Sequence, residues 1–128
     1  MKDQLQKKLI KMKTIIIKRV YDNKTSDGTY RILVDRLWPR GLSKTDLSFD
    51  EWDIEITPST ELRKWFAHKE ERYAEFSKRY IQELNLKSEE TMRLRNMAEK
   101  KSLTLLYAAK DPAINHAVIL RDFLLNNK

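Results

Sequence analysis

The chain has 128 residues, a formal net charge of +7, two histidines and no cysteine. This length predicts one domain whose core needs no covalent cross-links. The lack of cysteine excludes disulfides, thiolate metal sites and cysteine nucleophiles, and it fits a cytoplasmic protein. Two histidines fall short of a typical zinc site, and no stretch approaches the roughly 20 apolar residues of a membrane span. We therefore expect no metal, no cofactor and no membrane contact.

Residues 1–13 are expected to form a basic arm ahead of a single α/β domain at residues 14–128. Four lysines outnumber one aspartate in residues 1–11, and the segment lacks the apolar stretch of a secretory signal. Met12 stands just before the first strong element and is an alternative start of the natural chain. The rest of the chain is also basic, which attracts anions but equally serves solubility.

The first half of the chain predicts strands separated by turns. Residues 14–21 hold three consecutive isoleucines, and residues 30–36 hold a near-continuous apolar run. The intervening residues 22–29 are rich in turn formers and, at about eight residues, short for a parallel crossover, so we expect an antiparallel first pair. Alternation in residues 52–57 predicts an edge strand or an extended segment.

Three amphipathic helices are predicted next: one that contains residues 62–66, one over residues 69–84 and one that contains residues 94–98. Thr57 or Ser59 is expected to cap the first of them, and Ser88 the third. The aromatic and methionine stripes of these helices predict core packing rather than a cofactor site.

A second apolar strand and a last helix complete the chain. Residues 103–107 form a short apolar run suited to a strand that is buried on both faces. Asp111 is expected to cap a helix that begins at Pro112 and runs to about Leu125. Together the elements predict a small α/β fold with a mixed, partly parallel sheet covered by helices in three layers.

Polar side chains gather where the two apolar strands end. Ligands of open α/β sheets bind beyond the carboxyl ends of the strands, arginine offers a planar fork for carboxylate or phosphate, and a helix N-terminus favours an anion. If both loops lie at one edge of the sheet, Arg36, Arg40 and the start of the last helix would converge on one negatively charged group. The candidates are Asp35, Arg36, Trp38 and Arg40 after the first strand, and Lys110, Asp111, Asn115 and His116 after the second.

These candidates divide by predicted role. His116 and Asp35 are the candidate catalytic residues, with His116 as general acid or base because histidine titrates near neutral pH. The candidate ligand-binding residues are Arg36, Trp38, Arg40, Lys110 and Asn115. Trp38 would form a wall of the site, and Asn115 would orient a polar ligand.

Each candidate also has a structural alternative. Asp35 and Arg36 could form an ion pair that locks the loop, and Trp38 could simply cover the core. Lys110 could lie on the surface, and His116 could be a neutral hydrogen-bonding residue. His68, at the end of a helix, could either cap carbonyl groups or contact the ligand.

Several segments carry a family resemblance: residues 17–21, 33–42, 58–68 and 105–111, with Asn115-His116-Ala117. In these segments the chain resembles the YeaO-like family, a bacterial domain-of-unknown-function family. The resemblance extends from about Thr14 to Leu125. It implies a compact α/β fold and a cytoplasmic bacterial protein, and it implies no established reaction.

The resemblance does not supply a thiol mechanism. More distant relatives carry a cysteine at the position of Tyr107 and Cys-His-Arg at the positions of residues 115–117, which suggested thiol chemistry for that branch. Here both cysteines are absent and only His116 remains. Any function of this loop must therefore rest on Asn115, His116 and the basic residues.

Three functions follow from these features. The first is binding of a small anionic ligand that bears phosphate or carboxylate. In an extension of this function, the protein is an enzyme that uses arginine charge stabilisation and a histidine acid/base. The second is a nucleic-acid-binding module, for which the positive charge and the arginines near Trp38 and Trp65 argue. The third is a partner-binding or regulatory protein without catalysis.

Overall fold

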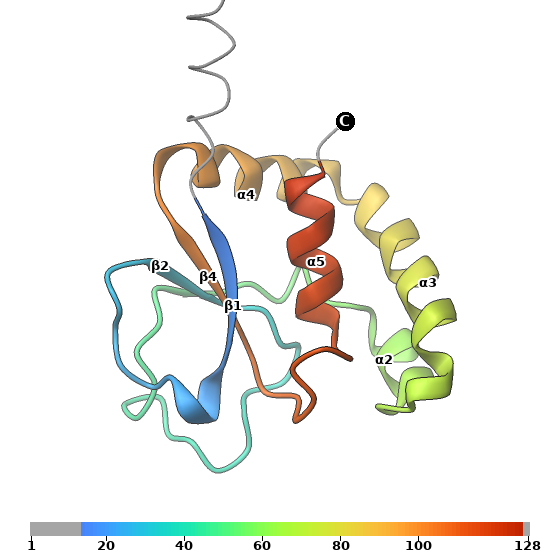
Figure 1. The fold of residues 1–128 in the computed structure, drawn as a ribbon, viewed down its shortest axis with the longest axis horizontal. Helices are drawn as coiled ribbons and strands as arrows, with labels where there is room; N and C mark the ends of the chain where they lie inside the picture. Colours follow the sequence, from blue (N-terminus) through green and yellow to red (C-terminus); the bar gives the residue numbers. More distant parts are fainter. Residues whose placement is uncertain (1–13, 127–128) are drawn as a thin grey trace, which may run out of the picture.

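The computed structural model describes residues 14–126 and contains a four-stranded parallel sheet (Figure 1). The strands are β1 (Ile15–Arg19), β2 (Tyr30–Leu33), β3 (Glu51–Trp52) and β4 (Leu103–Tyr107). They lie in the order β1-β4-β2-β3, so β1 and β3 form the edges. Of the segment predicted as extended at residues 52–57, only Trp52 pairs in the sheet. The small α/β fold is confirmed. The basic arm and the start at Met12 lie outside the described residues.

The expected antiparallel pairing of the first two strands is wrong. β4 lies between β1 and β2, and both of them run parallel to it, with Leu103 opposite Ile15 on one side and Tyr30 on the other. β1 and β2 have only 5 and 4 residues, so each spans about 13–17 Å at 3.3 Å per residue. Residues 20–29 are therefore long enough to return to the start of β2 without a helix, and the sheet is wholly parallel rather than mixed.

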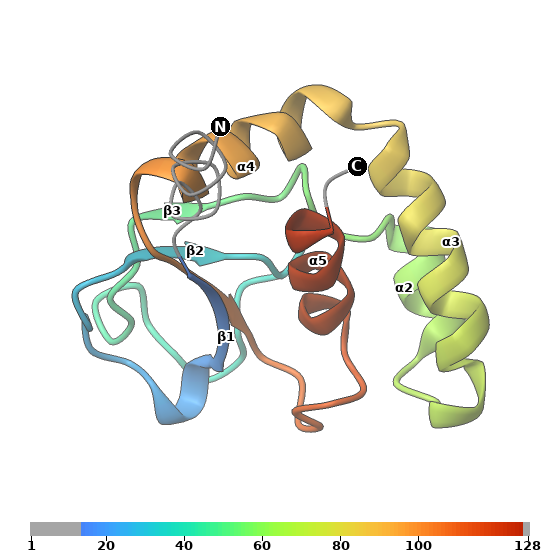
Figure 2. The ribbon, with the colours of Figure 1, turned by 45° about the horizontal axis from the view of Figure 1, so that its top comes forward.

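Four helices accompany the sheet: α2 (Thr60–Phe66), α3 (Tyr73–Asn85), α4 (Ser88–Lys100) and α5 (His116–Leu125), with single 3₁₀ turns η1 (Val20–Asp22) and η2 (Glu70–Arg72). Figure 2 shows α5 between the sheet and α3. Ser59 caps α2 as predicted, by accepting a hydrogen bond from the Leu62 N–H at 3.1 Å. No helix within residues 14–126 combines the length and the apolar character that a membrane span needs.

Two of the predicted helix starts are wrong. Ser88 is the first residue of α4, and its predecessor Lys87 holds the cap position without a side-chain cap. α5 begins at His116 rather than at Pro112. Asp111 instead accepts hydrogen bonds from the N–H groups of Ala113 and Ile114, which forms a tight turn and leaves the cap to a later residue.

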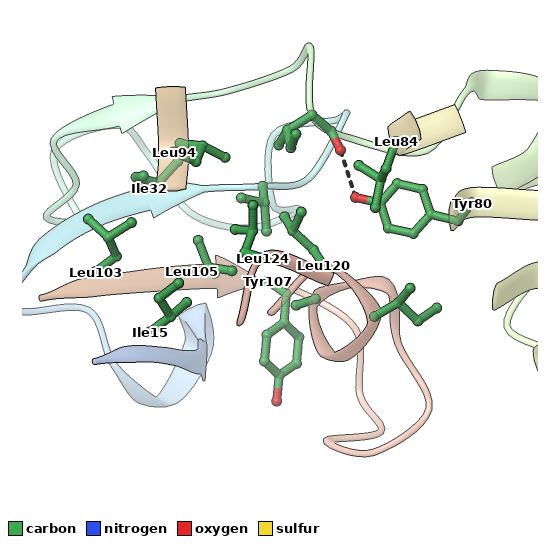
Figure 3. Packing of buried hydrophobic residues seen from close by; sticks show 14 of the residues in the cluster. Ile15, Ile32, Tyr80, Leu84, Leu94, Leu103, Leu105, Tyr107, Leu120 and Leu124 are labelled. Atoms are coloured by element: carbon green, nitrogen blue, oxygen red, sulfur yellow. Dashed lines mark hydrogen bonds between the residues drawn. The ribbon is translucent and has the colours of Figure 1, made fainter. Parts of the chain in front are cut away.

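The two faces of the sheet are covered differently. Alternate strand residues on one face pack against residues of all four helices. Figure 3 shows part of this cluster, with strand residues Ile32, Leu103 and Leu105 and helix residues Tyr80, Leu84, Leu94 and Leu120. Within this layer the Tyr80 hydroxyl donates to the Ile56 carbonyl at 2.6 Å. The other face, with Leu33 and Leu106, is covered by the chain between β2 and β3. The outer layer expected on that side is thus a loop rather than helices.

The loop-covered face contains one buried charge, Arg31 of β2, which is 1% exposed. Its Nε donates to the Ser48 carbonyl at 2.8 Å, and its Nη atoms donate to Asp27 and to the Asn23 carbonyl. Asp27 also accepts a hydrogen bond from the Lys18 ammonium at 2.7 Å, and that bond holds the pKa of Asp27 well below its usual range. Arg31 thereby fastens two loops to the sheet.

Candidate functional site

A pocket of about 600 Å³ opens at the carboxyl end of the sheet. Its residues come from four parts of the chain: the segment after β2, the surroundings of α2, Phe76 of α3, and the segment from the end of β4 to the first residue of α5. The polar and charged side chains among them are Asp35, Arg36, Arg63, His68, Glu70, Lys110, Asp111 and His116. A volume of this size is in the range of small-molecule sites.

The two strand ends meet in this pocket because the sheet is parallel. Oδ2 of Asp35, after β2, accepts a hydrogen bond from the Ala108 N–H, after β4, at 2.9 Å. Nε2 of His116 hydrogen-bonds with the Val34 carbonyl at 2.7 Å. The two candidate loops thus lie at one edge of the sheet and contact one another directly.

His116 is held by its Nε2 atom. A carbonyl oxygen only accepts, so Nε2 carries the hydrogen in the neutral ring as well as in the charged one. The same nitrogen lies 3.1 Å from Oδ1 of Asp35, but that buried oxygen accepts no hydrogen bond among the described residues. The contact joins the strand ends, and only Nδ1 is left to exchange a proton.

Two arginines present free donors to the pocket. Arg36 is half-buried, and its Nε donates to the Pro58 carbonyl at 3.0 Å, which fixes the guanidinium plane. Arg63 is a half-buried residue of α2 whose Nε is fully covered and has no hydrogen-bond partner within residues 14–126. Lys110 adds an exposed ammonium group at the rim. The pocket therefore contains guanidinium N–H groups that the protein itself does not satisfy.

Three carboxylates balance these cations formally, but two of them are engaged. Asp35 accepts from Ala108, and Asp111 accepts from the N–H groups of Ala113 and Ile114 at 2.8 and 3.1 Å. Glu70 lies exposed at the rim. Among the described residues, the pocket therefore keeps unused donors on Arg36 and Arg63 and one unused buried acceptor, Oδ1 of Asp35. The donors suit an acceptor group on a ligand.

Trp38 and Arg40 are not brought to this pocket. Trp38 packs on the loop-covered face against Phe49 and Trp52, with ring centroids 5.5 and 5.6 Å apart, and its indole N–H donates to the Leu42 carbonyl. Arg40 is exposed, and its carbonyl accepts from the Tyr21 hydroxyl at 2.7 Å. The expected convergence of Arg36 and Arg40 is absent from the pocket, because the chain turns away at Pro39.

Asn115 supports the pocket from behind. It is 1% exposed, and its Oδ1 accepts from the Val118 N–H at 3.1 Å while its Nδ2 donates to the Asp111 carbonyl at 2.8 Å. It is the N-cap of α5 and does not line the pocket. Its side chain therefore positions His116, the next residue, rather than orienting a ligand.

Asn115→Ala is expected to lower the free energy of unfolding by about 1–2 kcal/mol, because the mutation removes a helix cap and a buried hydrogen bond. Urea denaturation followed by circular dichroism measures the loss. Asn96→Ala, at an exposed position of α4, is the matched control and should leave stability unchanged or slightly higher. A variant at Asn115 as stable as the wild type would contradict the capping role.

Sequence reasoning missed Arg63, Phe66, Phe76 and Glu70 as pocket residues. Phe66 and Phe76 belong to apolar stripes, and Arg63 lies in an amphipathic helix where arginine ordinarily faces solvent. The only signal for Arg63 was its place inside the segment 58–68 of the family resemblance.

His68 contacts the pocket and makes no hydrogen bond to a carbonyl within residues 14–126, so the capping alternative is not found. Ala67 and His68 both adopt left-handed backbone, with φ of 48° and 57°, which ends α2 at the pocket rim. Two such non-glycine residues in succession are strained, and the strain lies at the edge of the candidate site.

Over the described part of the chain, no group of three histidine, aspartate or glutamate side chains is placed to hold a metal ion.

Comparison with known proteins places the chain in a family. Residues 14–128 match the family described as the inactive DUF488-N3 subclade. The uncharacterised protein YeaO of Escherichia coli K12 is 56% identical over 107 residues, which cover 84% of this chain and 93% of that protein. An uncharacterised protein of Mycobacterium tuberculosis H37Rv is 34% identical over 116 residues, covering 91% and 98% respectively. No solved structure gives a significant match.

Proposed function

Because the chain belongs to the YeaO-like bacterial family, in the inactive DUF488-N3 subclade, we propose that its pocket binds a small anionic ligand without transforming it. The description of the subclade as inactive favours binding over catalysis. The contacts of His116 and Asp35 agree with this, since both side chains join the two strand ends. In this proposal they hold the pocket in shape, and the arginines bind the ligand.

The observation that carries the proposal is the guanidinium of Arg63. Its Nε is buried without a partner, and leaving a buried charged donor unsatisfied costs free energy. A carboxylate or phosphate between Arg63 and Arg36 would supply acceptors to both, and such charge-assisted bonds are the strong ones. Lys110 at the rim would add attraction for the same charge.

Arg63→Met is expected to weaken anion binding about 10- to 100-fold, because hydrogen bonds to charged groups are worth roughly 1.5–3 kcal/mol. Stability should hold or rise, since an unpaired buried charge is replaced by an apolar chain of similar length. The measurement is a thermal-shift panel of phosphate, sulfate, sugar phosphates and organic acids, followed by calorimetric titration. A ligand at about 100 times its Kd stabilises by about 2.7 kcal/mol.

Arg79→Met is the matched control for this test. Arg79 lies on α3 outside the pocket and pairs with Glu75 at 2.9 Å. The Arg79→Met variant should bind every anion with the same affinity as the wild type. Equal affinities of the wild type and Arg63→Met for all anions, or no anion binding at all, would overturn the proposal.

The nucleic-acid alternative finds little support in the placement of the tryptophans. The ring of Trp65 is flanked by the guanidinium groups of Arg72 and Arg79, at 5.2 and 4.5 Å from its centroid. Trp38 packs among aromatic side chains on the loop-covered face. Neither ring is offered as a stacking platform for bases. A short RNA in the same panel, at low and moderate salt, tests this alternative directly.

A further inference from the structure

The pocket has apolar lining residues beside its charged groups. Phe66 and Phe76 lie with stacked rings, 4.2 Å between centroids and 16° between planes, and Ile114 and Leu37 continue the apolar lining. Leu37 is 60% exposed. An exposed leucine alone is ordinary, but here it borders a cavity whose other walls are aromatic and aliphatic. A ligand that fills the cavity would have to cover this side with apolar atoms.

The charged side of the pocket suits one negative charge rather than several. Arg36 and Arg63 offer the free guanidinium donors, and Lys110 stands at the rim. Asp35, Glu70 and Asp111 line the same cavity, so the formal charge of the lining sums to zero with both histidines neutral. A polyanion would bring added charge close to three carboxylates, whereas a single carboxylate can be held by the two arginine forks.

We infer that the ligand is an amphipathic monocarboxylate, with one carboxylate on an aromatic or aliphatic body. The inference rests on the proposed function and specifies its ligand class. The carboxylate lies between Arg63 and Arg36, and the apolar body lies against Phe66, Ile114 and Leu37. A sugar phosphate fits less well, because its hydroxyl groups would replace water along an apolar wall that offers them no partners.

The experiment is a calorimetric titration of the full chain with five probes: 3-phenylpropionate, octanoate, the neutral amide of 3-phenylpropionate, glucose 6-phosphate and inorganic phosphate. At least one of the two monocarboxylates is expected to bind ten-fold or more tightly than both the amide and the sugar phosphate. Arg63→Met should reduce the preference for the acid over its amide about ten-fold, because that preference comes from the charge of the carboxylate and Arg36 still binds part of it.

Leu37→Ser tests the apolar wall separately. Because Leu37 is exposed, its replacement should leave folding intact, and it should weaken the monocarboxylate several-fold without weakening inorganic phosphate. Leu86→Ser is the matched control, since Leu86 is 87% exposed and lies outside the pocket.

The outcomes separate this inference from the proposed function. Binding of glucose 6-phosphate or inorganic phosphate that depends on Arg63, without binding of either monocarboxylate, would overturn the ligand class and leave the anion site standing. Equal binding of the acid and its amide in the wild type would overturn both. Failure of all probes, inorganic phosphate included, would overturn both as well.

Discussion

Arg31→Met is expected to lower the free energy of unfolding by about 3 kcal/mol. The substitution removes the donors of the Ser48 and Asn23 carbonyls and one of the donors to Asp27 on the loop-covered face. Breaking a buried charge network from one side is strongly destabilising, because its acceptors lose their partners. Lys18 still neutralises Asp27, which keeps the loss from being larger.

The loss is measured by urea denaturation of the wild type and Arg31→Met at the same pH. Arg79→Met serves again as the control, because it removes an arginine of the same length from an exposed position, where ion pairs contribute about 0–1 kcal/mol. A loss at Arg31 no larger than the loss at Arg79 would contradict the structural role of Arg31.

Asp53 is the second residue with a large expected effect, and it responds to pH. It is 7% exposed, next to the edge strand β3. Burial, together with a hydrogen bond to Glu90 and the charge of Glu90, raises the pKa of Asp53 to about 7 from the ordinary 3.8. Arg93 lies 2.7 Å from Glu90 and 3.3 Å from Asp53, so the pair shares one cation. The folded protein therefore retains a proton on Asp53 that the unfolded chain releases.

The sign of the pH effect follows from that raised pKa. The proton on Asp53 contributes fully to the stability of the folded protein below pH 3.8, and this contribution is lost as the pH rises through about 7. At 1.36 kcal/mol per pKa unit, the rise from 3.8 to about 7 means that the wild type should lose roughly 4 kcal/mol relative to Asp53→Asn across this window. The amide of the variant imitates the protonated carboxyl group and does not titrate. Urea midpoints between pH 4.5 and pH 8 measure the difference.

Glu99→Gln is the control for the pH experiment, because Glu99 is exposed on the same helix as Glu90. Its stability should follow the wild type at every pH. Parallel curves for the wild type and Asp53→Asn would show that Asp53 is charged at neutral pH in the folded protein, which would contradict the expected proton.

The elements of the fold were predictable from local sequence, but their pairing was not. The isoleucines of β1 and the leucines of β4 predict strands, and the apolar stripes of α3 and α4 predict helices. The pairing of β1 with β4 joins residues about 90 positions apart, which no local pattern encodes. The capping error at Asp111 arose because polar residues that favour helix caps also form turns, and the error at Ser88 is a shift of the helix start by one residue.

The part of the candidate site that follows the ends of β2 and β4 was predictable from the sequence. Asp35, Arg36, Lys110 and His116 follow closely on the two strands, and all four line the pocket. Arg40 lies only a few residues further on, and one turn at Pro39 directs it elsewhere. Arg63 depends on how α2 packs against the sheet, which is a tertiary fact that one sequence does not express.

One of the two inner strands of the sheet, β4, is also the last strand in chain order, and this has a consequence for synthesis. β1 pairs in the sheet only with β4, which follows all the other strands along the chain. On the ribosome, where N-terminal segments emerge first, β1 must therefore stay without its partner until β4 has been translated. Ile15 and its neighbours are exposed throughout that interval. A nascent chain paused before β4 is thus a natural client for chaperones that bind short apolar segments.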